Sequence, residues 1–158
     1  MDSKIKGPAA LSEILKYLRS KGKIIVFTNG CFDIIHFGHI RYLSRAKKIG
    51  DVLVVGLNSD SSVRLLKGEG RPINKENDRA RILASLYFVD YITKFSELTP
   101  EKLIKKIRPD VLVKGGDWKI KDIVGSDYVK SYGGRVVSLP FVKGYSTTYL
   151  IKKIARHG

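Results

Sequence analysis

The chain has 158 residues, of which 43% are hydrophobic and 28% charged, and its formal net charge at pH 7 is +15. This length fits a single domain over residues 1–158. No apolar run approaches the roughly 18 residues that span a bilayer, and residues 1–6 lack the apolar core of a signal peptide. We therefore expect a cytoplasmic protein without a membrane segment. The single cysteine excludes an intramolecular disulfide and argues against structural zinc, and the basic residues are spread over the whole chain, which argues against nucleic acid as a partner.

Apolar periodicity predicts helices that alternate with strands. Apolar residues at helical intervals, flanked by proline, glycine or hydroxyl residues, indicate helices, and short runs rich in Val and Ile indicate buried strands. In chain order we expect a leading helix within residues 1–22 (8–21), a strand at 24–27, a helix around 40–47, a strand at 51–57, a helix through 63–66, a mobile basic loop at 67–74, a helix at 77–86, a strand at 89–93, a helix at 101–107, a strand at 111–113, a helix at 123–132, a strand at 135–139 and a helix from about 146 to 154.

This alternation predicts an α/β fold, a Rossmann-like, doubly wound parallel sheet of five strands with helices on both faces. Unusual polar residues follow the first, fourth and fifth strands. If the first strand is central, these three strand ends meet in one crevice at the switch point of the sheet. We expect the last helix to turn Leu150, Ile151 and Ile154 inward.

Two of the three histidines lie in the run His36-Phe37-Gly38-His39, between the first strand and a helix. Residues three apart share a helix face, a glycine admits close approach of a ligand, and a helix N-terminus favours anions, so this position suits phosphate. A metal site would need a third His or a Glu at suitable spacing, and the sequence has neither there. The chain also lacks the GxGxxG dinucleotide motif and the phosphate-binding P-loop. Packing of one histidine ring in the interior is the structural alternative.

Thr28 to His39 resembles the signature of the HxGH nucleotidyltransferase superfamily, which includes the cytidylyltransferases. Further segments follow in the order and spacing of one branch, the D-glycero-β-D-manno-heptose 1-phosphate adenylyltransferases, and the resemblance extends from about Leu11 to Ile154. These segments are Asn58–Asp60, residues 67–74, Arg79, Val113–Trp118 and Gly144–Thr148.

The resemblance implies transfer of AMP from ATP, with Mg²⁺, to a heptose 1-phosphate, giving ADP-heptose for lipopolysaccharide core and pyrophosphate. By the same resemblance His36, His39 and Lys67 are catalytic, Asp33, Lys67 and Arg71 contact the sugar phosphate, and the metal ligands are unknown. The nucleotide-binding residues implied are Thr28, Asn29, Gly30, Cys31, Phe32, Gly38, His39, Asn58, Arg79, Lys114, Gly115, Gly116, Asp117, Ser146, Thr147 and Thr148. For Lys67 a solvated loop lysine, and for Ser146 a plain helix cap, are the structural alternatives.

The alternative enzyme is a glycerol-3-phosphate or other alcohol-phosphate cytidylyltransferase that uses CTP. Such enzymes resemble one another in an arginine before the Ser-Thr pair, where this chain has Phe141-Val142-Lys143. We expect small-molecule substrates (ATP and a sugar 1-phosphate), no fused kinase domain, and a homodimer if the sheet edges are exposed. A nucleic-acid-binding domain would need a stripe of basic and aromatic residues on one face. Trp118 is expected to pack rather than bind.

Overall fold

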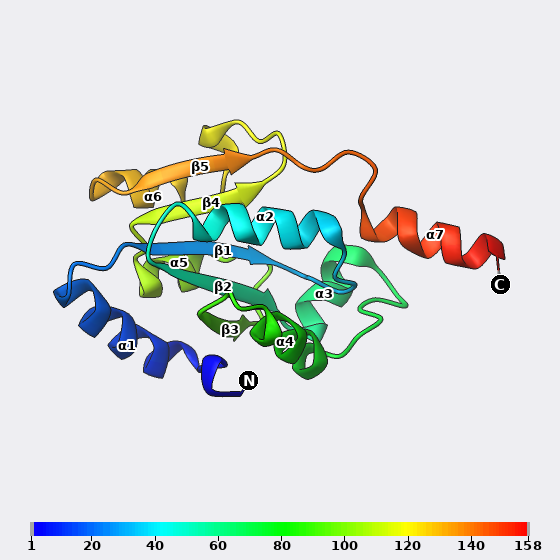
Figure 1. Cartoon of the computed structure of the whole chain (residues 1–158), viewed down its shortest axis with the longest axis horizontal. Helices are drawn as coiled ribbons and strands as arrows, with labels where there is room; N and C mark the ends of the chain where they lie inside the picture. The colour runs from blue at the N-terminus through cyan, green and yellow to red at the C-terminus, as the bar shows by residue number, and fades with distance from the viewer. Residues whose placement is uncertain (1, 158) are drawn as a thin grey trace.

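A computed structural model describes residues 2–157, with side chains through Arg156, and its five strands form one parallel sheet (Figure 1). The strand order β3-β2-β1-β4-β5 makes β1 central, as expected, with the switch point between β1 and β4, where the strand order reverses. Register pairs Val26 with Leu53 on one side and with Val111 on the other. The strands are β1 Ile25–Gly30, β2 Val52–Asn58, β3 Tyr91–Phe95, β4 Val111–Gly115 and β5 Arg135–Leu139.

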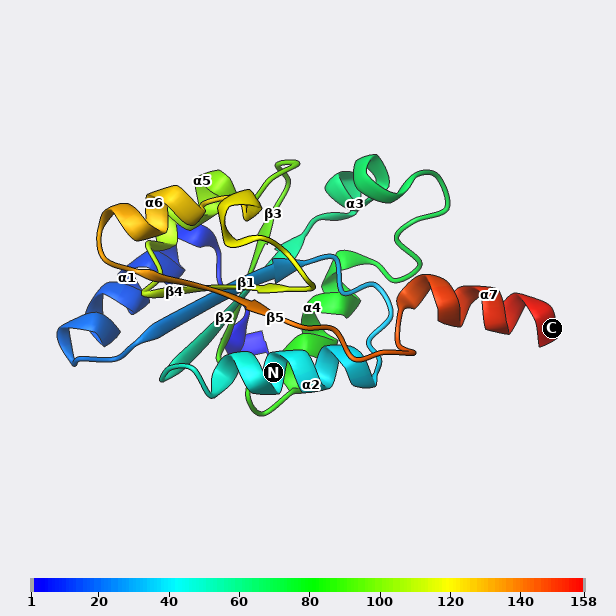
Figure 2. The same ribbon diagram turned by 90° about the horizontal axis from the view of Figure 1, so that it is seen from above.

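Helices cover both faces of the sheet, as Figure 2 shows with the sheet nearly edge-on. One face packs against α2 and α4, and the other against α1, α5 and α6, so that each face has its own apolar cluster. None of the helices within residues 2–157 has the length and apolar character needed to cross a bilayer. The helices are η1 Asp2–Lys4, α1 Pro8–Ser20, α2 Phe37–Lys47, α3 Asp60–Lys67, α4 Glu76–Ser85, α5 Glu101–Ile107, η2 Ile120–Asp122, α6 Ser126–Ser131 and α7 Thr147–His157.

Alternate residues of β1 face opposite sides of the sheet, and this sets the sides of the site. Val26 belongs to the cluster beneath α2 and α4, whereas Ile25 and Phe27 belong to the cluster beneath α1, α5 and α6. Because side chains of a strand alternate, Thr28 faces α2 and Asn29 faces α5 and α6 at the carboxyl end of the same strand.

Several local expectations differ from the structure. The first strand runs past its expected end at residue 27 to Gly30, because its register with β2 continues to the pair Gly30 and Leu57. Within the expected helix at 123–132 only the short α6, Ser126–Ser131, forms, because Gly125 has a left-handed φ of 85° immediately before Ser126; the 3-10 turn η2 precedes this span. The third strand begins at Tyr91, so that Val89 is buried ahead of it. The expectation that α7 turns Ile154 inward is wrong: this side chain is 67% exposed, and α7 extends away from the rest of the protein (Figure 1).

The two edges of the sheet are unequal. Ile5 forms a parallel bridge with Ile92 of β3, and the Lys6 amide donates a hydrogen bond to the Ile92 carbonyl at 2.9 Å. The N-terminal segment therefore covers part of the β3 edge, which weakens the edge-based argument for a homodimer on that side.

Candidate functional site

The two histidines lie against each other at the start of α2. His36 is the residue that precedes the helix, His39 is in its first turn, and their rings stack with centroids 3.9 Å apart. A Cβ added at Gly38 would lie 3.0 Å from Nδ1 of His36 and 3.1 Å from Cβ of Tyr145. The glycine therefore leaves the space in which the His36 ring and the loop before α7 meet.

The surroundings of both histidines favour the neutral imidazole. Burial lowers the pKa of His36, and burial together with the neighbouring His36 lowers the pKa of His39 to about 4. The buried Nδ1 atoms of both rings have no hydrogen-bond partner among the described residues. Unpartnered buried polar atoms are rare, so the pair is suited to an external ligand that accepts or donates hydrogen bonds.

Phe32 supports His39 from behind. It is buried, its φ is 45°, and its ring meets the ring of His39 edge-on at 5.3 Å between centroids. A Cβ added at Gly30 would lie 2.9 Å from the Phe32 ring. A left-handed backbone at a bulky residue costs free energy, which the packing around Phe32 offsets. The structure thus places Gly30 and Phe32 where they orient a histidine.

Thr28 is tied to α2 by Tyr42, a residue that the sequence argument missed. Oγ1 of Thr28 is fully buried and 2.6 Å from Oη of Tyr42, which also donates to the Val113 carbonyl at 3.3 Å. Burial raises the pKa of Tyr42 strongly, so it stays protonated. Its position three residues after His39 put it on the same helix face, which was the available signal.

Arg79 is completely buried and joins the ends of β1 and β2. Its Nη1 donates to the carbonyls of Cys31 at 2.6 Å and of Asn58 at 2.9 Å, and its Nη2 donates to Oδ1 of Asp60 at 2.7 Å. The Asn58 side chain in turn donates to Oγ of Ser62 at 3.1 Å. The guanidinium and the Asn58 amide are therefore engaged within the protein, where they fix the ends of the two strands.

Asp33 fastens the second half of the 67–74 loop to the histidine turn. Its buried carboxylate accepts hydrogen bonds from Nε of Arg71 at 2.7 Å and from the amides of Ile73 and Asn74 at 2.9 Å each. Burial alone would raise the pKa of Asp33, but these donors lower it below its ordinary value. Arg79 adds a bond from Nε to the Asn74 carbonyl at 2.9 Å. The second half of the loop, expected from sequence to be mobile as a whole, is therefore anchored to the histidine turn and to α4.

Lys67 ends α3 and is exposed, with Gly68 following at a φ of 89°. Its charge lowers the pKa of the Cys31 thiol, although burial raises that pKa overall, and it adds to the burial that lowers the pKa of Lys114. The ammonium groups of Lys67 and Lys114 are thus within electrostatic reach of one region, at the end of β1.

The start of α7 comes up to the histidine turn from the end of β5. The Tyr145 ring lies 6.3 Å from that of His36 and 5.3 Å from that of Phe37, and Oγ1 of Thr147 is 3.5 Å from the Ile34 carbonyl. Oγ of Ser146 accepts a hydrogen bond from the Tyr149 amide at 3.0 Å, which confirms it as a helix cap. Thr148 is exposed in the first turn of this helix.

On the α2 side, aromatic rings lie directly against the two glycines at the end of β4. A Cβ added at Gly115 would lie 3.2 Å from the rings of Phe141 and Tyr42, and one at Gly116, whose φ is 115°, would lie 2.9 Å from Phe141. The Phe141 ring is 69% exposed, and Asp117 is exposed beside it in sequence. Phe141 was missed as a candidate because a single aromatic after a strand does not reveal its exposure.

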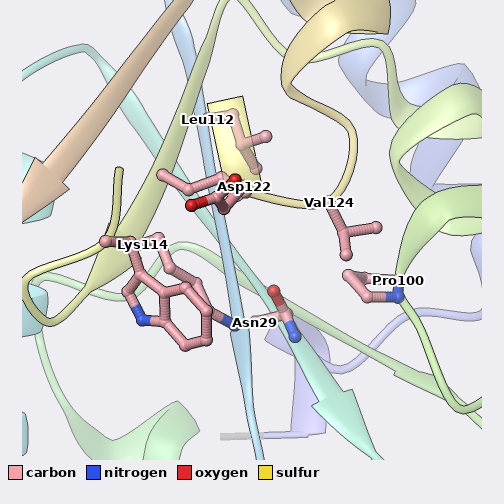
Figure 3. A pocket seen from close by; sticks show the side chains of 8 residues that line it. Asn29, Pro100, Leu112, Lys114, Asp122 and Val124 are labelled. Atoms are coloured by element: carbon pink, nitrogen blue, oxygen red, sulfur yellow. The ribbon is translucent and has the colours of Figure 1, made fainter. Parts of the chain in front are cut away.

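On the opposite side of β1 and β4 lies a pocket of about 90 Å³ (Figure 3). Its polar lining is Asn29, Lys114 and Asp122 together with the indole of Trp118, and its walls are Pro100, Leu112, Ile123 and Val124. Trp118 is 49% exposed, its Nε1 donates to the Gly115 carbonyl at 3.1 Å, and its ring centroid is 6.0 Å from Nζ of Lys114. Trp118, which the sequence leaves out of the predicted site, thus lies half exposed at the edge of this pocket and outside the apolar core.

Within residues 2–157 no group of three or more His, Cys, Asp or Glu side chains is placed to hold a metal ion. Both oxygens of Asp33, the carboxylate nearest in sequence to the histidines, accept hydrogen bonds from the protein. His36 and His39 thus lack a third protein ligand in the described part of the chain, and the metal-binding alternative for this pair loses its support.

Comparison with known proteins yields a family and several relatives. Residues 27–153 match the model of the family described as Cytidylyltransferase-like. The chain is 56% identical over 155 residues to the bifunctional protein HldE of Geobacter metallireducens, and 57% identical over 154 residues to that of Campylobacter concisus. These alignments cover 98% and 97% of this chain but 32% and 31% of the relatives, so the chain spans about a third of the length of the curated relatives it matches.

Two solved structures resemble the fold. The lipopolysaccharide core biosynthesis protein from Thermoplasma volcanium gives a TM-score of 0.64 at 34% identity and covers 79% of this chain and 100% of its own. The pantoate-beta-alanine ligase from Francisella tularensis gives a TM-score of 0.59 at 18% identity, with 97% of this chain and 76% of its own covered. The second likeness concerns the fold alone.

Proposed function

The chain belongs to the cytidylyltransferase-like family, and on this premise we propose that it transfers AMP from ATP to D-glycero-β-D-manno-heptose 1-phosphate. A phosphate oxygen of the sugar phosphate attacks the α-phosphorus of ATP, the bond from that phosphorus to the bridging oxygen breaks, and pyrophosphate leaves with the bonding electrons. Two observations support the choice of a heptose phosphate: the motifs along the chain, and a sequence identity of 56% and 57% to two proteins named HldE.

The observation that carries the proposal is the stacked histidine pair with its unpartnered nitrogens, placed between the starts of α2 and α7. Phosphate oxygens are strong hydrogen-bond acceptors, and helix N-termini add amide donors and partial positive charge. An imidazole that is neutral and fixed still has one N–H to donate. We therefore assign His36 and His39 to the phosphates of ATP, where they donate as charge builds on the departing pyrophosphate.

Little proton chemistry is required of this site. A phosphate nucleophile is already ionised near neutral pH, so the protein accelerates the reaction by positioning the reactants and by stabilising charge. Lys67, exposed at the end of α3 and in electrostatic reach of the end of β1, is assigned to the reacting phosphates. Ser146 and the first amides of α7 are assigned to the β- and γ-phosphates.

The nucleoside is assigned to the α2 side of the sheet. The absence of side chains at Gly115 and Gly116 lets the Phe141 ring lie against the end of β4, and this ring is 69% exposed, so it can stack on a base. Thr28, Gly30, Phe32 and Arg79 support this side through contacts within the protein, and the Asn58 carbonyl takes part as an acceptor of Arg79.

Mg²⁺ is proposed to arrive with ATP. Magnesium usually keeps several waters and binds to phosphate oxygens through few protein ligands, which agrees with a site that offers no cluster of carboxylates among residues 2–157. It would supply charge neutralisation on the triphosphate. Since ATP and sugar phosphates are products of the cell interior, we place the reaction in the cytoplasm; the homodimer remains an expectation.

CTP is the alternative donor, with Lys143 supplying the charge that related cytidylyltransferases take from an arginine before the Ser-Thr pair. A pyrophosphate-release assay with ATP or CTP, combined with the heptose 1-phosphate or glycerol 3-phosphate, decides between them. We expect release with ATP and the heptose phosphate. Release only with CTP and glycerol 3-phosphate would establish the alternative, and no release with ATP and the heptose phosphate would sink the proposal.

A further inference from the structure

We propose that the pocket formed by Asn29, Lys114, Trp118 and Asp122 is the subsite of the acceptor, and that it binds the sugar ring of a sugar 1-phosphate. This proposal rests on the proposed function, because it takes the histidine side as the site of the ATP phosphates. The pocket therefore receives the second substrate.

The direction of attack on the α-phosphorus places the acceptor on the side of β1 opposite the histidines. In phosphoryl and nucleotidyl transfer the attacking and leaving oxygens lie roughly in line on opposite sides of the phosphorus. The groups assigned to the pyrophosphate, His36, His39 and the start of α7, lie on the α2 side of β1. The acceptor must then approach from the other side, where Asn29 points into the pocket.

The two sides of the sheet lie close together at the ends of β1 and β4. Thr28 and Asn29 are consecutive residues with Cα atoms about 3.8 Å apart, yet they face opposite sides of the sheet. Likewise Lys114 lines the pocket, and the next residue, Gly115, borders the surface near Phe141. A phosphate over the ends of β1 and β4 can therefore be approached from both sides at once.

The side chains that line the pocket have the chemistry that a phosphorylated sugar requires. A half-exposed indole offers an apolar face to the C–H groups of a sugar, and amide and carboxylate groups hydrogen-bond its hydroxyls. Figure 3 shows the side chains of Asn29, Lys114 and Asp122 around one opening, with Pro100 and Val124 along the far wall. An ammonium within reach of an anion completes a set that matches a phosphorylated sugar rather than an apolar ligand.

The volume and the charge of the pocket also fit a small anionic ligand. At about 90 Å³ the pocket is much smaller than the about 300–1,000 Å³ of sites that enclose drug-sized ligands, so it suits one ring and not a whole nucleotide. Burial lowers the pKa of Lys114, with Lys67 acting in the same direction, so that an anion bound beside Lys114 would favour its charged form.

Trp118 is the only tryptophan of the chain, so its fluorescence reports on the pocket without any substitution. We would titrate the wild-type protein with D-glycero-β-D-manno-heptose 1-phosphate, with and without saturating α,β-methylene ATP. The expected result is a saturable change in emission. Absence of any change, under conditions where the same sugar phosphate supports pyrophosphate release, would overturn the proposal.

Substitution of Asp122 provides the second test. Asp122→Asn should raise the KM for the sugar phosphate about tenfold or more and leave the KM for ATP unchanged, because a hydroxyl loses a charged acceptor. Asp127→Asn, which changes an exposed aspartate of α6 outside the pocket, is the matched control and should change neither constant. A rise in the KM for ATP alone, or no change in either KM, would contradict the assignment.

Failure of the proposed function would be recognised separately. If the heptose phosphate gives no pyrophosphate, the fluorescence titration is repeated with mannose 1-phosphate, glucose 1-phosphate, glycerol 3-phosphate and inorganic phosphate. Saturable binding of a sugar phosphate, weakened by Asp122→Asn and not by Asp127→Asn, would support the subsite although the heptose assignment had failed. Response to inorganic phosphate alone, to glycerol 3-phosphate alone, or to none of them would overturn it.

Discussion

The two sides of β1 differ in how their functional groups are held. On the α2 side His36 and His39 are stacked, neutral and supported by Phe32 and Tyr145. On the α5 and α6 side an indole, an amide, an ammonium and a carboxylate surround an open pocket. Donors that meet developing charge act best when their positions are fixed in advance, whereas groups that recognise a substrate have to be reachable from solvent.

Loss of the hydrogen bonds by which Arg79 holds the ends of β1 and β2, behind the histidine side, should have the largest effect on stability. Arg79→Met removes the donors to two carbonyls and to Asp60, and leaves buried acceptors unpaired. We expect the free energy of unfolding to fall by about 3–5 kcal/mol, measured by urea denaturation. Arg81→Met on the exposed face of the same helix is the control and should change it by less than about 0.5 kcal/mol. Equal effects of the two substitutions would contradict this structural role of Arg79.

Removal of a histidine tests the chemistry on the same side. His39→Ala should lower kcat by about two orders of magnitude or more, the usual size for a donor that stabilises a transition state, while the protein remains folded. Steady-state pyrophosphate release and the circular dichroism spectrum check the two parts. An unfolded variant would favour the structural role of the ring, and a folded variant with full kcat would remove His39 from the mechanism.

The alternation of helices and strands, the histidine turn and the cap at Ser146 were predictable, because periodicity, helix caps and turn residues are local signals. The strand ends were not: β1 continues to Gly30 and β4 to Gly115, past the expected ends at residues 27 and 113. The burial of Arg79 was not, since it depends on carbonyls of Cys31 and Asn58 that are distant in sequence. The position of Trp118 depends equally on tertiary structure, because the pocket that it lines is formed with Asn29 and Pro100, which are distant in sequence. The apolar stripe of α7 predicted a buried face, but no other element covers Ile154 within residues 2–157.

The neutral state of His39 predicts a pH dependence of stability. Its pKa in the folded protein is about 4, against an ordinary value of 6.5, so between these values the unfolded chain binds a proton that the folded protein does not. Stability should therefore decrease as pH falls, by roughly 1–2 kcal/mol between pH 7 and pH 5 from this group. Urea denaturation at both pH values checks this. His39→Gln should lose that part of the dependence, and an unchanged dependence in this variant would contradict the assignment.

The most direct test of the account is calorimetric titration of each substrate into two variants, one from each side of β1. Asp122→Asn should weaken the binding of the heptose 1-phosphate by about tenfold and leave that of ATP with Mg²⁺ unchanged, whereas Ser146→Ala should weaken only ATP, by a similar or smaller factor. Wild-type protein provides the reference, and the sugar phosphate is titrated in the presence of α,β-methylene ATP. Opposite selectivities of the two variants are the result predicted here. Weakening of the same substrate by both variants would contradict a division of the two substrates between the sides of β1.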